Sequence, residues 1–110
     1  MQRALLVMKM SPGDAPHVAR AFADHDRSSL PTDIGAVRRT LFSYHGLYFH
    51  LVEAPDTLDG DLMDRIYAWR AHPVFAETAE RVKPYLSPYV PTWQGPRDSR
   101  ATEFYCWEAE

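Results

Sequence analysis

The sequence predicts an α+β protein in which strands and helices follow one another in the order βαββαβ. Two observations carry this prediction. Apolar runs of strand length occur at four places along the chain, and the segments between them space their apolar residues as amphipathic helices do. The chain has 110 residues, which suits one domain with a single modest core. We therefore expect one domain over residues 1–110.

The first strand is expected over Ala4 to Met10, a short and almost wholly apolar run. The letters SPGD then mark a turn, and Asp14 is placed to cap a helix from Ala15 to about His25. Spacings of three and four residues define one face of this helix: Val18, Ala21, Phe22 and His25. The histidine therefore shares the face that turns towards the core.

The next two strands are expected over Val37 to Tyr44 and Leu47 to Ala54, after a loop with the letters SSLPTDIG. They form a hairpin with His45-Gly46 at the turn, which places Leu41 opposite His50. Alternation of side chains then defines two faces. One face carries Arg39, Leu41, Ser43, Tyr48, His50 and Val52, and the other carries Thr40, Phe42, Tyr44, Leu47, Phe49 and Leu51. We expect the first face to turn towards the helices.

The second half of the chain predicts helices from about Gly60 to Ala71 and from Val74 to Tyr85. The proline-rich segment LSPYVPTWQGPRDS is expected to be an irregular connection. A final strand is expected over Ala101 to Trp107, where residues with high β propensity gather. The whole order is that of a ferredoxin-like fold, a four-stranded antiparallel sheet with helices on one face.

The helices can cover only one face of such a sheet, yet both faces of the hairpin are rich in apolar side chains. The face that carries Phe42, Phe49 and Leu51 therefore needs another cover. A homodimer packed sheet to sheet, as in a dimeric α/β barrel, is the simplest one.

Composition and charge argue against several classes of protein. The net charge is -3 and the basic residues are scattered, so we expect no nucleic acid partner. The longest apolar runs are too short to span a membrane and the N-terminus lacks a cleavage-type site, so we expect a cytoplasmic protein. Cys106 is the only cysteine and no recognised metal-binding spacing occurs, so we expect neither an internal disulfide nor a metal site.

Four polar residues on separate elements are candidates for a catalytic site: His25, Asp26, Arg39 and His50. Each has an ordinary explanation when taken alone, because core histidines, helix-ending imidazoles and ion-paired arginines are common. The combination is more informative. Two imidazoles, a guanidinium and a carboxylate that converge on an aromatic-lined interior indicate acid–base chemistry.

Several segments follow one another in a distinctive order and spacing: AFADHD, then LP and IG, then VRRTLFSYHGLYFHLVEA, then HPVF, RVKPYLSPY and FYCWEA. Over nearly the whole chain this order resembles the small aromatic polyketide cyclases. His25 and Asp26 match the family's histidine–aspartate pair, Arg39 matches its strand arginine, and His50 matches its strand histidine. The segment TLDGDLMDR departs from the family because it is longer.

The resemblance implies a ferredoxin-like homodimer that acts in bacterial polyketide biosynthesis (antibiotic or spore pigment), without metal or organic cofactor. It implies a small-molecule polyketide substrate and a transient contact with a polyketide synthase complex. The implied reaction is an intramolecular aldol-type ring closure of a poly-β-ketone intermediate, with dehydration and aromatisation.

The residues suit that reaction. Hydrogens between two carbonyl groups are acidic enough for an imidazole to remove near neutral pH, and Arg39 can stabilise the resulting oxyanion. The sequence does not assign which histidine is the base and which is the acid. Two other functions remain open on the same fold, a cofactor-free anthrone-type monooxygenase and a non-catalytic polyketide-binding chaperone.

Overall fold

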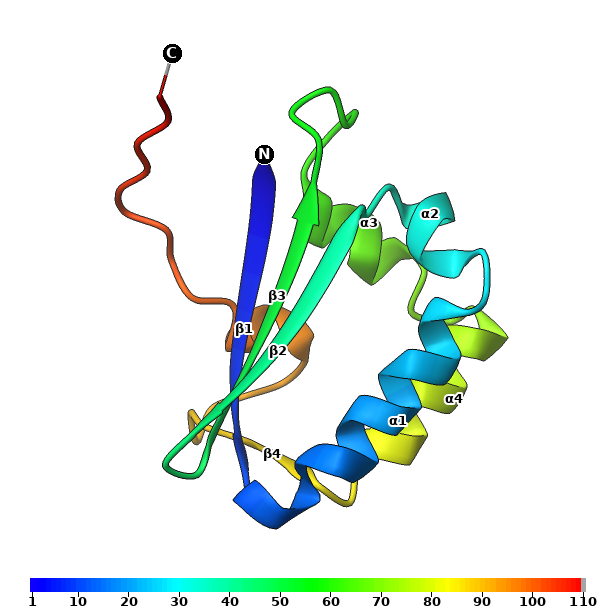
Figure 1. The fold of residues 1–110 in the computed structure, drawn as a ribbon, viewed down its shortest axis with the longest axis vertical. Helices are drawn as coiled ribbons and strands as arrows, with labels where there is room; N and C mark the ends of the chain where they lie inside the picture. Colours follow the sequence, from blue (N-terminus) through cyan, green and yellow to red (C-terminus); the bar gives the residue numbers. More distant parts are fainter. Residues whose placement is uncertain (110) are drawn as a thin grey trace.

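The computed structural model describes residues 1–109 and confirms the α+β, ferredoxin-like architecture (Figure 1). All strand pairs of the four-stranded sheet are antiparallel, and the spatial order is β2-β3-β1-β4. The strands are β1 (Gln2–Met10), β2 (Arg38–Tyr44), β3 (Leu47–Ala54) and β4 (Leu86–Pro88). The α-helices are α1 (Ala15–Asp26), α2 (Leu30–Ile34), α3 (Leu62–Ala68) and α4 (Pro73–Val82), with 3-10 turns at η1 (Pro12–Asp14) and η2 (Pro96–Ser99).

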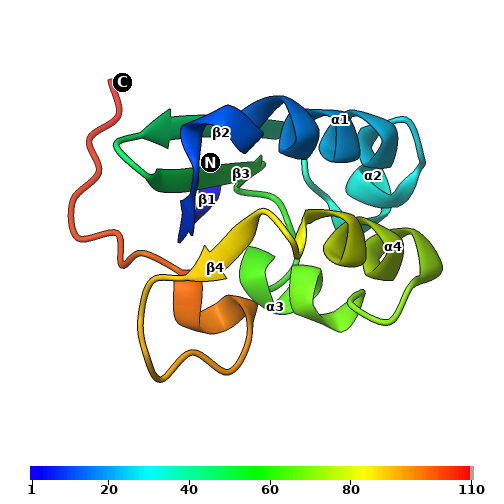
Figure 2. The ribbon, with the colours of Figure 1, turned by 90° about the horizontal axis from the view of Figure 1, so that it is seen from below.

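The helices form a layer on one side of the sheet, and α1 and α4 lie side by side within it (Figures 1 and 2). Two groups of buried side chains fill the space between the layers. One group centres on Leu30 and Leu62 near α2 and α3, and the other centres on Val18 and Tyr48 under α1. The core therefore lies between β1 and β3 and the helical layer.

The β2–β3 hairpin has the register that the sequence predicts. Leu41 pairs with His50, and the turn residues His45 and Gly46 have φ angles of 46° and 80°. Positive φ at both turn positions gives the strands the twist that a two-residue hairpin needs. Glycine adopts this conformation without steric cost, which is why the turn forms here.

The two faces of the hairpin also point as predicted. Along β3 every second residue is buried, namely Tyr48, His50, Val52 and Ala54. These residues face the helices. On the opposite face Phe42 is 51% exposed and Tyr44 is 63% exposed, so within the described chain this apolar face has little cover.

The prediction of a final strand over Ala101 to Trp107 is wrong. The fourth strand is instead the short β4, which pairs with the end of β1 through Met10 and Leu86. The chain then touches β1 again near Leu6 and Arg100 and leaves the sheet. High β propensity describes a fit to a half-buried pleated surface, and a segment without a strand edge beside it forms no ladder. Exposure is high at Phe104, Tyr105 and Trp107.

The helices differ from the prediction mainly at their ends. The expected loop after α1 contains the short helix α2, which begins at Leu30 and is followed by Gly35 as a left-handed C-cap. The helix expected from Gly60 begins only after Asp61, whose side chain accepts a hydrogen bond from the backbone N–H of Asp64.

Asp14 precedes α1 as predicted, but its carboxylate makes no capping hydrogen bond. The turn η1 gives Asp14 a helical backbone conformation, with φ of -89° and ψ of -7°. Capping side chains usually need an extended conformation at this position. The short turn η1 therefore leads into α1 in place of a side-chain cap.

Candidate active site

A cavity of about 160 Å³ lies between the sheet and the helices. Apolar side chains form most of its wall, including Met8, Phe22, Ile34, Val52, Phe75 and Val82. Polar side chains at the wall include His25, Arg39, Tyr48, His50 and Thr78. The segment after β4 also contributes Trp93, whose indole N–H donates to the Ser99 hydroxyl at 2.6 Å. The site is thus a small apolar chamber with a few polar groups.

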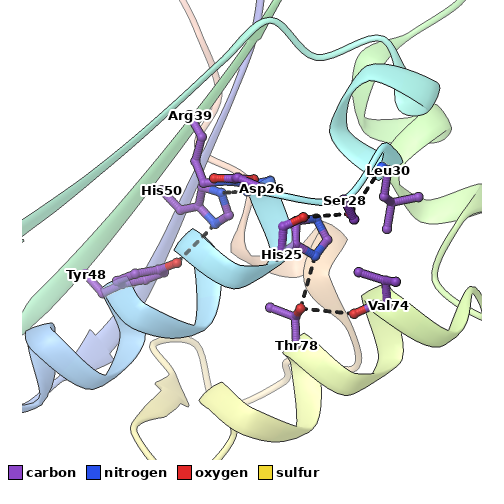
Figure 3. A network of polar contacts seen from close by, with 9 residues as sticks. All are labelled: His25, Asp26, Ser28, Leu30, Arg39, Tyr48, His50, Val74 and Thr78. Carbon is purple, nitrogen blue, oxygen red and sulfur yellow. Dashed lines mark hydrogen bonds and ion pairs between the residues drawn. The ribbon is translucent and has the colours of Figure 1, made fainter.

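Arg39 contacts two of the other three predicted residues, Asp26 and His50 (Figure 3). Its Nε donates to both carboxylate oxygens of Asp26, at 3.0 and 3.1 Å, and its Nη1 lies 2.6 Å from Nε2 of His50. The guanidinium also lies 4.8 Å from the ring centroid of Phe22, where a cation–π contact adds to its anchoring. These contacts hold the guanidinium on the cavity wall.

His50 is buried, and both of its ring nitrogens have partners. Arginine can only donate, so Nε2 of His50 must accept the Arg39 bond through its lone pair. Burial first, and then the charge of Arg39, lowers the pKa of His50 from 6.5 to about 3. A neutral ring with an unprotonated Nε2 carries its proton on Nδ1. His50 therefore donates from Nδ1 to the Tyr48 oxygen, 3.0 Å away.

His25 differs from His50 because only one of its ring nitrogens, Nδ1, has a hydrogen-bond partner. The Thr78 hydroxyl donates to the backbone carbonyl of Val74 at 3.0 Å, so its oxygen accepts from Nδ1 of His25, also at 3.0 Å. Within residues 1–109 Nε2 has no hydrogen-bond partner, and no side-chain nitrogen or oxygen there is both buried and unpartnered. Nε2 of His25 therefore carries an accessible lone pair.

The pKa of His25 lies below its ordinary value of 6.5. Burial is the main cause, because it disfavours the charged imidazolium, and the positive charge of Arg39 acts in the same direction. Asp26 opposes this shift. At neutral pH His25 is therefore an uncharged imidazole, as a proton acceptor must be.

The structure brings together all four residues that the sequence singled out. His25 and Asp26 come from the end of α1, Arg39 from β2 and His50 from β3. Their catalytic role stays a prediction.

Two further polar residues, Tyr48 and Thr78, were not singled out as candidates from the sequence. Tyr48 lies two residues before His50, on the same face of β3. This alternation was the one signal that could have pointed to it.

The remaining histidines lie away from the cavity wall. His17 stacks on Tyr85, with ring centroids 5.0 Å apart, and His72 accepts a hydrogen bond at the start of α4. In the described part of the chain no three His, Cys, Asp or Glu side chains group as metal ligands would. Over the same residues no helix is both long and apolar enough to cross a membrane.

Comparison with known proteins gives a family match over almost the whole chain. Residues 2–108 match the family described as polyketide synthesis cyclase. Tetracenomycin F2 cyclase of Streptomyces glaucescens is 52% identical over 107 residues, which are 97% of this chain and 94% of that protein. Polyketide synthase CurG of Streptomyces cyaneus is 33% identical over 111 residues, covering 100% of both.

Solved structures give a consistent result. The structure of tetracenomycin F2 cyclase, a type-II polyketide cyclase, superposes with a TM-score of 0.91 at 51% identity over 100% of both chains. A protein from Caulobacter crescentus with a suggested role as an antibiotic biosynthesis monooxygenase has a TM-score of 0.51 at 16% identity over 76% of each chain. At this identity the second similarity shows the fold alone.

Proposed function

The chain belongs to the polyketide synthesis cyclase family and is an aromatic polyketide cyclase, and we propose that it closes one ring by an intramolecular aldol reaction followed by loss of water. The observation that supports this reaction is the presence of an open imidazole and an anchored guanidinium on one apolar cavity. An aldol closure needs a base and a group that stabilises an oxyanion, and these side chains are of those two kinds.

In this proposal His25 is the base. Its Nε2 lone pair is open, its Nδ1–H is held by Thr78, and its lowered pKa keeps the ring neutral at neutral pH. Nε2 removes a proton from carbon between two carbonyl groups of the substrate, which leaves an enolate and an imidazolium. His50 has no free nitrogen for this step. We therefore assign His50 a positioning role.

Arg39 stabilises the enolate. Its Nε and Nη1 are held by Asp26 and His50, which leaves the Nη2 hydrogens without a protein partner within residues 1–109. A guanidinium whose orientation is already set does not have to reorganise when negative charge develops next to it. Asp26 and His50 thus act through Arg39.

The remaining steps balance without an oxidant or a reductant. The enolate carbon forms a bond to a carbonyl carbon of the same chain, and the resulting alkoxide takes a proton from the His25 imidazolium. Neutral His25 then takes a proton from the carbon next to the new hydroxyl and returns it to that hydroxyl, which leaves as water. Enolisation of the remaining ring carbonyls makes the ring aromatic. The reaction as proposed therefore needs no metal or organic cofactor.

The test uses tetracenomycin F2, because the most similar of the relatives named above carries that substrate in its name. Dialysed protein with a chelator, under nitrogen, is expected to convert the compound into a product that is lighter by one water. Oxygen uptake with a product enriched in oxygen would support a monooxygenase instead. Full conversion by a His25→Gln/Arg39→Lys double variant would support a non-catalytic chaperone.

A second assay covers a different natural substrate. The protein is co-expressed with a minimal aromatic polyketide synthase, and the products are compared with those made in its absence. A shift towards one cyclised aromatic product is expected. An unchanged product pattern together with no reaction on tetracenomycin F2 would reject the proposed reaction.

We also propose that the protein is a homodimer that packs sheet against sheet. The support is the exposed apolar face of the hairpin, where Phe42 and Tyr44 are both more than half exposed. The C-terminal segment adds exposed aromatic side chains at Phe104, Tyr105 and Trp107. Large apolar side chains exposed in this number often mark a surface that a partner covers.

A further inference from the structure

Tyr48 is a polar residue at the cavity wall that has no part in the reaction as proposed above. It lies in the middle of the sheet on β3, is only 2% exposed, and contacts the cavity with its side chain. Figure 3 shows its hydroxyl directed towards the ring of His50. A phenol buried this deeply normally uses its hydrogen in a bond.

The direction of the Tyr48–His50 bond decides what the hydroxyl hydrogen can do. Arg39 donates to Nε2 of His50, so the neutral ring carries its proton on Nδ1 and donates that proton to the Tyr48 oxygen. The phenol hydrogen therefore does not point at His50. Within residues 1–109 His50 is the only hydrogen-bond partner of the Tyr48 hydroxyl. The phenol hydrogen of Tyr48 can therefore be donated to a molecule in the cavity.

We propose that the Tyr48 hydroxyl is a second catalytic donor, which binds the oxygen of the substrate carbonyl that the enolate attacks. This inference rests on the proposed aldol function. An aldol closure involves two oxygens, one on the enolate and one on the attacked carbonyl. Arg39 and Tyr48 lie at the two nitrogens of one imidazole ring, so the site offers a separate donor for each oxygen.

The hydroxyl acts by polarising the carbonyl. As the carbon–carbon bond forms, the carbonyl oxygen gains negative charge and its hydrogen bond from Tyr48 becomes stronger. Burial raises the pKa of the Tyr48 phenol above its ordinary value, so the proton stays on Tyr48. His25 supplies the proton that neutralises the alkoxide, as in the proposed function.

The chain of hydrogen bonds from Arg39 through His50 to Tyr48 also explains why His50 is buried and neutral. Arg39 donates to one ring nitrogen of His50, and the other ring nitrogen donates to the Tyr48 oxygen. Hydrogen bonds in such a chain polarise and strengthen one another, so the positive charge of Arg39 makes the Tyr48 hydroxyl a stronger donor. His50 is therefore a positioning residue for Tyr48, whereas Arg39 and Tyr48 each contact one substrate oxygen.

The first test is Tyr48→Phe, which removes the hydroxyl and keeps the ring that packs in the core. With tetracenomycin F2 as the probe, kcat is expected to fall by about 10²-fold while KM changes little, because the bond strengthens only in the transition state. Tyr85→Phe is the matched control. Tyr85 stacks on His17 and does not contact the cavity, so its variant should keep the parental kcat.

The second test reads the His50 tautomer directly in the parental protein. Long-range ¹H–¹⁵N NMR at neutral pH is expected to show His50 protonated at Nδ1 and unprotonated at Nε2. In Tyr48→Phe the His50 Nδ1–H signal should shift, because its acceptor is lost. Thermal melting of each variant shows whether it is folded.

The outcomes separate this inference from the function on which it rests. A parental protein that fails both cyclisation assays would remove the function and the inference with it. An active parental protein whose folded Tyr48→Phe variant keeps its kcat would overturn the inference alone. A His50 ring protonated at Nε2 would overturn it too, even if Tyr48→Phe did not fold, because the phenol would then donate to His50.

Discussion

His25 and His50 are the same residue type on one cavity, yet their hydrogen bonds give them different chemistry. The hydroxyl of Thr78 fixes the proton of His25 on Nδ1 and leaves Nε2 open. Arg39 occupies the same nitrogen, Nε2, of His50. Each assignment follows from a neighbour that has only one way to bond, an arginine that cannot accept and a hydroxyl whose hydrogen is already used.

Replacing His25 by Gln should lower the cyclisation rate by about 10²–10⁴-fold, because an amide cannot take up a proton near neutral pH. In the parental protein the acid limb of the kcat/KM profile should lie below pH 6.5, since the pKa of His25 is lowered by burial. The measurement is a pH–rate profile on tetracenomycin F2. His17→Gln, outside the cavity, is the control. An unchanged rate for folded His25→Gln would remove the base assignment.

Replacing Arg39 by Lys keeps the charge and removes the planar fork. One ammonium group cannot bind Asp26, hold His50 and contact the substrate in the geometry that the guanidinium provides. We expect kcat to fall by about 10²–10³-fold. Arg38→Lys is the matched control, since Arg38 is the neighbouring and exposed residue on β2. If Arg39→Lys kept the same kcat as Arg38→Lys, Arg39 would have no part in catalysis.

The buried neutral His50 should make stability depend on pH. Its pKa is about 3 in the folded protein and near 6.5 when unfolded, so between these values the unfolded chain binds the extra proton. The contribution of neutral His50 to the free energy of unfolding is therefore fully present above about pH 6.5 and is lost as the pH falls towards 3. From pH 7 to pH 5 this single group should lower the free energy of unfolding by on the order of 2 kcal/mol.

Urea unfolding at pH 7 and pH 5 checks this expectation. The parental protein should lose more stability over this interval than His50→Gln, whose amide does not titrate. The difference between the two losses isolates His50 from His25, which titrates in both proteins. Equal losses would mean that His50 is not buried as a neutral ring.

At the scale of the elements, the short helix α2 ends at Gly35 with a φ of 105°. A side chain there would be strained by the backbone conformation, and a Cβ atom would collide with the side chain of Leu58. This end of α2 is also tied to α3, because Nε of Arg65 donates to the carbonyl oxygen of Ile34 at 2.6 Å. Ile34 contacts the cavity, so the cap helps to shape its wall.

Gly35→Ala should therefore destabilise the protein by about 1–3 kcal/mol, from left-handed backbone strain and the clash together. Chemical denaturation measures the change. Gly13→Ala is the control, because a Cβ atom at Gly13 meets nothing within 4 Å and its φ is not positive. Similar stability of the two variants would show that Leu58 moves aside and that the cap tolerates a side chain.

At the scale of the whole molecule, the uncovered sheet face predicts self-association. Phe42→Glu places a charge in the middle of the proposed interface, where burying it would be costly. Sedimentation velocity at micromolar concentration should show a dimer for the parental protein and a monomer for this variant. Val37→Glu, at an exposed apolar residue before β2, is the control and should stay dimeric. A monomeric parental protein would reject the proposed interface.

Much of the fold could be predicted because it depends on short-range chemistry. The turn His45-Gly46 sets the hairpin register, and alternation along β3 then places His50 on the helix side. Helix spacing places His25 on the inner face of α1. The prediction places the fourth strand in the wrong segment, because the residues of Leu86–Pro88 have little β propensity whereas those of Ala101 to Trp107 have much. Long-range packing decides which of them reaches the free edge of β1.

The sequence by itself determined the family, the first three strands and the four side chains His25, Asp26, Arg39 and His50 that the structure brings together. Periodicity, turn chemistry and residue order are enough for these. Only the tertiary structure decided the proton positions on the two histidines and the free hydrogen of Tyr48. The reason is physical: a hydrogen bond depends on which atoms of distant segments lie within about 3 Å of each other, and no local pattern specifies that distance.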